Sequence, residues 1–140
     1  MLILKNAKIY TMAGARYDKG YVTCDGGKIV AIGSMEDCPK AGKDDQEIDA
    51  AGMVLMPGLV DAHCHIGMVE DAMGFEGDDV NEMADPVTPH LRAIDGINQY
   101  DRAFEEARQF GVTTVVTGPG SSNVIGGQFT AIKTWGRTVD

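Results

Sequence analysis

The 140-residue sequence lacks any long apolar run, and no stretch approaches the roughly 20 residues that a membrane-spanning helix needs. Its N-terminus also lacks the layout of a secretory signal, in which a basic start precedes an apolar segment and a cleavage site of small residues. A complete (β/α)8 barrel takes roughly 250 residues, so the chain is too short to form one. These absences predict a cytoplasmic chain about the size of one ordinary domain.

Cysteine and positive charge are also scarce. Cys24, Cys38 and Cys64 are odd in number and form no CxxC pair, which argues against a disulfide framework and against a thiolate zinc knuckle. The 12 Lys and Arg residues face 21 Asp and Glu residues, which gives a formal net charge of −9. Such a surface repels phosphate backbones and anionic lipids, so the sequence predicts neither a nucleic-acid partner nor a membrane partner.

The acidity is concentrated in one segment, because no Lys or Arg lies between Lys43 and Arg92. Residues 67–90 are interrupted by Gly and Pro and predict a long excursion of the kind that often builds sites. Its acidic residues lack the spacing of an EF-hand, and we interpret them as a solvated lid. They are Glu70, Asp71, Glu76, Asp78, Asp79, Glu82 and Asp85.

Short strand signals dominate residues 1–56. Asp25-Gly26-Gly27 separates two apolar runs and is a strong hairpin signal, because glycine accepts the positive φ of tight turns. A bend is expected at Asn6-Ala7. The expected strands cover residues 2–4, 8–10, 21–24, 28–32 and 53–56. They predict a small antiparallel β unit with little core of its own.

The rest of the chain has an α/β pattern. Residues 59–65 predict a buried strand that runs into a loop. Apolar residues at helical spacing over 97–110 predict a helix, and Gly111 stands where a C-terminal cap belongs. The β-branched run 112–117 predicts a second buried strand, parallel to the first, which gives a βαβ unit. A strand-like stretch follows at residues 130–134.

Two histidines close the first strand of this βαβ unit. Because alternate side chains of a strand share a face, we expect Asp61, His63 and His65 to point one way and Cys64 the other. Two imidazoles on one face are well placed to bind one divalent metal as neutral ligands, with Asp61 orienting them. Cys64 is interpreted as a packed small hydrophobe. A bare His-x-His pair is common by chance, so the triplet needs its context.

That context is specific. Residues 49–65 resemble the signature of the amidohydrolase superfamily, in which Pro-Gly, two hydrophobic residues and Asp-x-His-x-His close the first barrel strand. Residues 27–33 resemble a hairpin strand of the family's N-terminal part. The helix ending at Gly111 and the strand after it resemble the family's first helix-to-strand step. The resemblance covers nearly the whole chain and is nearest to the imidazolonepropionase-like branch.

The resemblance implies a fold and a cofactor. The implied fold is α/β with a β-rich N-terminal part. It has a partial β-sandwich over residues 1–56, followed by the first βαβ portion of an incomplete TIM-type (β/α) barrel over residues 57–140. The implied cofactor is a divalent metal, usually zinc, present as one or two ions. In this sequence His63 and His65 would be its ligands, with Asp61 supporting them.

The resemblance also implies a reaction, the hydrolysis of a C–N bond in a small-molecule amide or cyclic amide by metal-activated water. Members of the family take further ligands from later strands, including two more histidines, a bridging carboxylated lysine or glutamate, and an aspartate that handles protons. We therefore expect an N-terminal fragment that is inactive alone, with its catalytic residues and bridging ligand beyond Asp140.

Three residues are weaker candidates for substrate contact. His90 lies in the acidic excursion, and Ser121 and Asn123 lie in a loop that leaves the second strand at its C-terminal end, where barrel enzymes bind substrates. A surface histidine and a plain turn are the competing interpretations. Lys133 follows too few strands to be the bridging lysine and is interpreted as a solvated side chain.

Two rival interpretations stay open. A non-catalytic binding or assembly module would keep an amidohydrolase-like shape without the chemistry, and a small metal carrier would use the histidine pair and the acidic stretch. An incomplete barrel also exposes unpaired strand edges and apolar faces. This exposure predicts a homo-oligomer, a strand-exchanged dimer or local disorder over residues 67–95.

Overall fold

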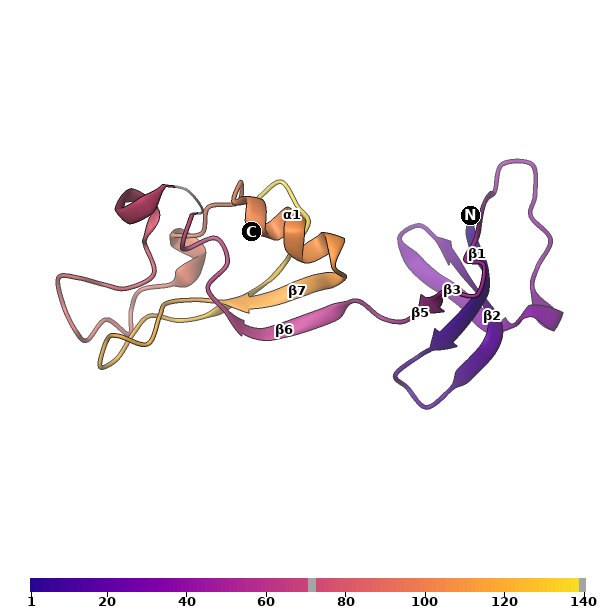
Figure 1. The fold of residues 1–140 in the computed structure, drawn as a ribbon, viewed down its shortest axis with the longest axis horizontal. Coiled ribbons are helices and arrows are strands. Elements are labelled where there is room, and N and C mark those ends of the chain that lie inside the picture. The colour runs from indigo at the N-terminus through magenta and orange to yellow at the C-terminus, as the bar shows by residue number, and fades with distance from the viewer. Residues whose placement is uncertain (71–72, 139–140) are drawn as a thin grey trace. The chain divides into compact units, whose positions relative to one another are not determined.

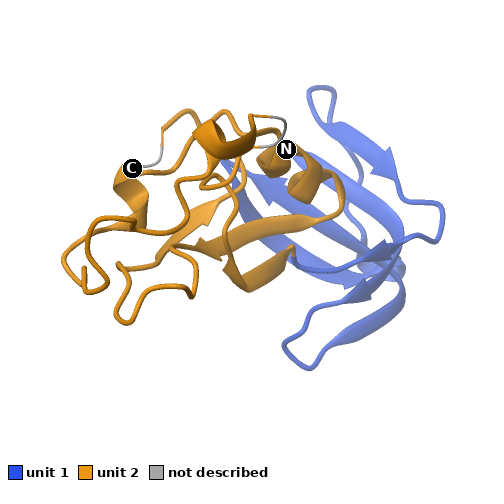
Figure 2. Cartoon of the chain, turned by 60° about the vertical axis from the view of Figure 1, so that its left-hand side comes forward, with its two compact units in different colours: residues 1–57 blue, residues 58–140 orange. Residues whose placement is uncertain are grey.

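The computed structural model describes residues 1–70 and 73–138 as a strand-rich mixed α/β fold (Figure 1). Asp71 and Asp140, named above, lie outside these residues. The chain divides into two compact units, Met1–Pro57 and Gly58–Asp140 (Figure 2). Within the described ranges, no helix is long and apolar enough to cross a bilayer.

The first unit is a mixed five-stranded sheet. Its elements are β1 (Leu2–Tyr10), β2 (Arg16–Asp25), β3 (Lys28–Ser34), the 3-10 helix η1 (Met35–Asp37), β4 (Gln46–Asp49) and β5 (Val54–Leu55). The strand order is β3-β2-β1-β4, and β5 also pairs with β1. The predicted hairpin is confirmed, because β2 and β3 run antiparallel across a turn in which Gly26 and Gly27 have φ angles of 54° and 76°.

Two expectations for this unit are wrong. β4 and β5 pair with β1 in parallel, so the sheet is not purely antiparallel. Asn6-Ala7 is not a bend between two strands but an irregularity within β1, where Asn6 has a φ of 58° and Ala7 is fully buried. Asparagine tolerates this left-handed conformation, and its side-chain amide donates to Asp49 Oδ2 at 3.0 Å. The bulge therefore tilts β1 without ending it.

The core of the first unit is small, as expected. One cluster of buried residues packs between the strands: Ala7, Ile9, Val22 and Ala50. On β3, by contrast, Ile29 and Val30 remain 70% and 63% exposed. The unit therefore has one well-filled patch and a largely uncovered apolar strand.

The second unit is built on a parallel strand pair. Its elements are β6 (Leu59–Cys64), η2 (Gly74–Gly77), η3 (Ala93–Asp95), α1 (Arg102–Gln109), β7 (Val112–Thr117) and β8 (Thr130–Lys133). β6 and β7 run parallel and are connected through α1, which lies along β7 in Figure 1, so the predicted βαβ unit is confirmed. β8 then returns antiparallel to β7.

The helix α1 begins later than predicted, at residue 102 rather than 97. Asp101 caps it, because its Oδ1 accepts a hydrogen bond from the Ala103 backbone N–H at 2.9 Å. Its Oδ2 accepts from the Gly67 N–H, also at 2.9 Å, which ties the helix to the segment after β6. Gly111 has a φ of 84°, which confirms the expected C-terminal cap.

Replacing Asp101 with alanine should lower the free energy of unfolding of the second unit by about 2–3 kcal/mol, because the helix loses its cap and a buried N–H loses its acceptor. Urea unfolding followed by Trp135 fluorescence measures the change. Asp18→Ala is the control, since Asp18 is highly exposed and lies in the first unit. Equal stability of Asp101→Ala and the parent protein would contradict this role.

Asp49 should make the first unit sensitive to acid. The Ala51 backbone N–H and the Asn6 amide, together with Lys5, hold the pKa of the Asp49 carboxyl below its usual value. A lowered folded-state pKa stabilises the protein above the unfolded pKa of about 3.9, and this stabilisation disappears as the pH falls through the folded value. Asp49→Asn should therefore be less stable than the parent near neutral pH and equally stable in strong acid. An equal stability difference at both pH values, measured by urea unfolding, would refute this assignment.

Candidate metal centre

The two histidine rings lie close together at the end of β6. His63 lies in the strand and His65 directly follows it, and their ring centroids are 5.3 Å apart in a T-shaped arrangement with an interplanar angle of 82°. His63 is exposed and His65 is half-buried. The Asp61 carboxylate accepts a hydrogen bond from the backbone N–H of His63 at 3.1 Å, so it supports the strand end next to the rings.

His65 is oriented by the end of the neighbouring strand. Its Nδ1 lies 2.7 Å from the carbonyl oxygen of Gly118, the residue after β7. A carbonyl oxygen can only accept, so Nδ1 carries a proton, and in the neutral ring the lone pair is then on Nε2. The Gly118 N–H in turn donates to the Cys64 carbonyl at 3.3 Å. This tautomer is the one that a metal bound at Nε2 requires.

Phe129 covers both imidazoles from the side of β8. Its ring centroid lies 5.0 Å from that of His63 and 6.3 Å from that of His65. A side chain at Gly118 would occupy the same space, because a Cβ built there would lie 2.4 Å from Phe129 Cγ. Gly118 thus allows the aromatic ring to reach the histidine pair. Sequence reasoning missed Phe129, since nothing in its local pattern links it to His63.

The donor set fits a divalent metal in part. Two imidazoles bound to one tetrahedral ion through Zn–N bonds of about 2.0–2.1 Å would place their centroids about 5 Å apart, close to the observed separation. Over residues 1–70 and 73–138, however, no group of three or more His, Cys, Asp or Glu side chains could hold a metal ion. The described residues therefore offer two ligands, fewer than the three or four that hold zinc firmly.

The weaker candidates lie apart from the rings or are otherwise engaged. His90 is exposed in the excursion and Ser121 is exposed in the loop after β7. Asn123 is half-buried, and its side-chain amide donates to the Glu82 carbonyl at 2.8 Å. Lys133 donates to Thr114 Oγ1 at 2.9 Å. Substrate contact by His90, Ser121 or Asn123 stays a prediction.

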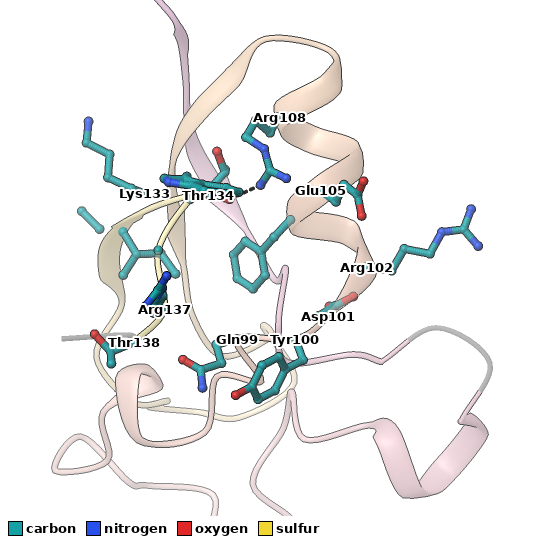
Figure 3. A pocket seen from close by; sticks show the side chains of 15 residues that line it. Gln99, Tyr100, Asp101, Arg102, Glu105, Arg108, Lys133, Thr134, Arg137 and Thr138 are labelled. Atoms are coloured by element: carbon teal, nitrogen blue, oxygen red, sulfur yellow. Dashed lines mark hydrogen bonds between the residues drawn. The ribbon is translucent and has the colours of Figure 1, made fainter. Parts of the chain in front are cut away.

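A cavity of about 520 Å³ lies between α1 and β8 in the second unit (Figure 3). Arg108 reaches from α1 to donate to the Thr134 carbonyl at 2.8 Å, and its guanidinium lies 4.7 Å from the centre of the Trp135 ring. Neither His63 nor His65 lines this cavity, so it is separate from the candidate metal centre.

Known proteins resemble the chain over most of its length. It is 36% identical over 115 residues to amidohydrolase tasK of Hapsidospora irregularis. The aligned region covers 81% of this chain and 12% of tasK. It is 32% identical over 120 residues to adenine deaminase of Bacillus pumilus, covering 84% of this chain and 15% of that protein. No protein-family model matches.

The structure of this chain resembles one part of a longer protein of known structure. The crystal structure of an amidohydrolase from Thermotoga maritima superimposes with a TM-score of 0.87 and 40% sequence identity. The match covers 99% of this chain and 35% of that chain. The chain therefore spans about a third of this structural relative and less of the two curated ones.

The contact between Gly118 and Phe129 can be tested by adding one methyl group. In Gly118→Ala the new Cβ collides with Phe129, so either the ring or the Gly118 carbonyl must move. We expect a loss of about 1–3 kcal/mol in stability. We also expect His65 to show a mixture of tautomers in the 15N NMR spectrum of its imidazole.

Gly126→Ala is the matched control, because a Cβ at Gly126 makes only an ordinary 3.5 Å contact with Pro119. Phe129→Ala combined with Gly118→Ala should recover the Nδ1-protonated tautomer. A single tautomer in Gly118→Ala alone would show that the ring and the carbonyl are not coupled.

Proposed function

Because the chain belongs to the amidohydrolase superfamily, we propose that it is the N-terminal part of a metal-dependent hydrolase that cleaves C–N bonds of amides or cyclic amides. The relatives are an amidohydrolase and a deaminase, and hydrolysis at carbon–nitrogen bonds is common to them. The observation that carries the proposal is the convergence of His63 and His65, with His65 fixed in the tautomer that leaves Nε2 available.

We propose an architecture that agrees with this function. Residues 1–56 form part of a β-sandwich, and residues 57–140 begin a TIM-type barrel whose first two strands are β6 and β7. The parallel pairing of these strands across α1 supports this assignment. β8 runs antiparallel to β7, so it is not the next strand of a parallel barrel.

In this mechanism His63 and His65 would together hold a divalent ion, and the whole enzyme would contain one or two such ions. When bound, such a metal, zinc in particular, supplies an activated water near neutral pH and polarises the scissile carbonyl. The Gly118 carbonyl accepts a hydrogen bond from Nδ1 of His65 and so directs the other ring nitrogen toward the metal position. Phe129 packs beside both rings.

The remaining ligands and the proton-handling carboxylate would come from parts of the protein outside these 140 residues. Two imidazoles with water in the remaining positions bind zinc weakly. The chain alone is therefore proposed to bind metal loosely and to be inactive as a hydrolase.

Zinc binding tests the proposal directly. We expect His63→Ala and His65→Ala each to weaken zinc binding at least about tenfold, because one of two ligands is lost. Isothermal titration calorimetry on the chain measures this, with His90→Ala as the control that retains binding. Unchanged zinc affinity in both histidine variants would overturn the metal assignment and favour a non-catalytic binding module.

A further inference from the structure

The backbones of the two histidines are held in different ways. His63 lies inside β6, and this strand pairs with β7 at Asp61 and Cys64, on either side of the histidine. β6 ends at Cys64, so His65 is the first residue beyond the regular strand. The orientation of the His65 ring therefore depends on what holds the turn that follows it.

The chain turns directly after His65. The Met68 N–H donates to the His65 carbonyl at 3.0 Å, and Gly67 within the turn has a φ of 84°. A Cβ at Gly67 would lie 2.9 Å from Ile97 Cγ2 and 3.0 Å from the Phe104 ring. The turn therefore needs glycine both for its backbone conformation and for its close packing against these two side chains.

Thr117, the last residue of β7, holds this turn from the side of the sheet. Its Oγ1 donates to the Ile66 carbonyl at 2.8 Å, and its side chain is fully buried. Val115 lies two residues earlier on the same face of β7 and is 1% exposed. An apolar residue of the same shape thus suits this buried face, so what the Thr117 hydroxyl adds is the hydrogen bond to the turn.

Two adjacent residues at the end of β7 therefore restrain His65. The Gly118 carbonyl accepts from the His65 ring at 2.7 Å, and the Thr117 hydroxyl donates to the main chain of the residue after His65. Without the Thr117 bond the turn could shift relative to the Gly118 carbonyl. A hydrogen bond weakens steeply as its length and angle depart from the optimum, so the ring bond depends on the backbone bond.

We propose that Thr117 is a positioning residue for the candidate metal centre. Its hydroxyl fixes the turn after His65, which keeps the imidazole Nδ1 on the Gly118 carbonyl and leaves Nε2 for a metal. Metal ligands need to be held within about 0.5 Å of their working positions, so a small shift of the turn would weaken binding. The statement about a metal rests on the proposed function, whereas the statement about ring orientation does not.

Thr117→Val tests the proposal, because it keeps the shape of the side chain and removes the hydroxyl. In alkaline buffer, 15N spectra of the metal-free parent chain should show neutral His65 protonated at Nδ1 alone, whereas Thr117→Val should show both tautomers. Zinc affinity, measured by isothermal titration calorimetry, should fall about fivefold, less than when a group bonded directly to a ligand is lost. Thr117→Ser, which restores the hydroxyl, should recover both readings.

Thr134→Val is the matched control. Thr134 is also buried, and its Oγ1 donates to the Val112 carbonyl at 3.0 Å, at the opposite end of β7 from His65. The two valine variants should lower the melting temperature by similar amounts, because each loses one buried hydrogen bond. Only Thr117→Val should change the tautomer of His65 and the zinc affinity.

The same tautomer and zinc affinity in both valine variants would overturn the positioning role. A Thr117→Ser variant that resembles Thr117→Val would overturn it too, because the methyl group and not the hydroxyl would then be responsible. If Thr117→Val does not fold, Thr117→Ala compared with Thr134→Ala makes the same test with less bulk in the core.

The two proposals fail separately. The tautomer of His65 is read in the metal-free chain, so it tests Thr117 even if His63→Ala and His65→Ala leave zinc binding unchanged. Zinc binding that needs both histidines, together with a single tautomer and full zinc affinity in Thr117→Val, would refute the role of Thr117 and leave the proposed function standing.

Discussion

The parallel pairing of β6 with β7 is the constraint on which the rest of the second unit depends. Parallel strands end at the same edge of a sheet, so His65 after β6 and Gly118 after β7 become neighbours and share a 2.7 Å hydrogen bond. Because β8 runs antiparallel to β7, it starts at that same edge and delivers Phe129 there. His65, Gly118 and Phe129, which are far apart in the sequence, thus lie together because of the directions in which the three strands run.

Local rules predicted the features that depend on local geometry. Alternation along a strand placed His63 and His65 on one side, and glycine at 26, 27 and 111 marked a turn and a helix end correctly. Pairing between distant segments has no local signature, so the parallel alignment of β4 and β5 with β1 was not foreseen. A bend was expected at Asn6, but pairing with the neighbouring strands keeps β1 continuous, and the residue forms a bulge within it.

In the candidate site, too, only the residues that are close together in the sequence could be predicted. The histidine pair could be found because the two residues lie two positions apart, whereas Phe129 reaches them from 64 residues beyond His65. The acidic excursion was interpreted as solvated because its side chains are charged, yet its backbone is what bonds to the loop after β7. Main-chain pairing of this kind leaves no trace in side-chain chemistry, so the bond from the Thr88 N–H to the Ile125 carbonyl could not be predicted.

The loop over residues 118–128 connects the histidine pair to the acidic excursion. One end carries the carbonyl that orients His65, and the other leads into the ring that covers His63. Between these ends the loop supplies Asn123 and is bonded to the excursion. The bond from the Asn123 amide to the Glu82 carbonyl therefore also restrains the two residues that shape the histidine pair. Coupling of this kind acts equally in both directions, so a metal that ordered the rings would also stabilise the contacts between the loop and the excursion.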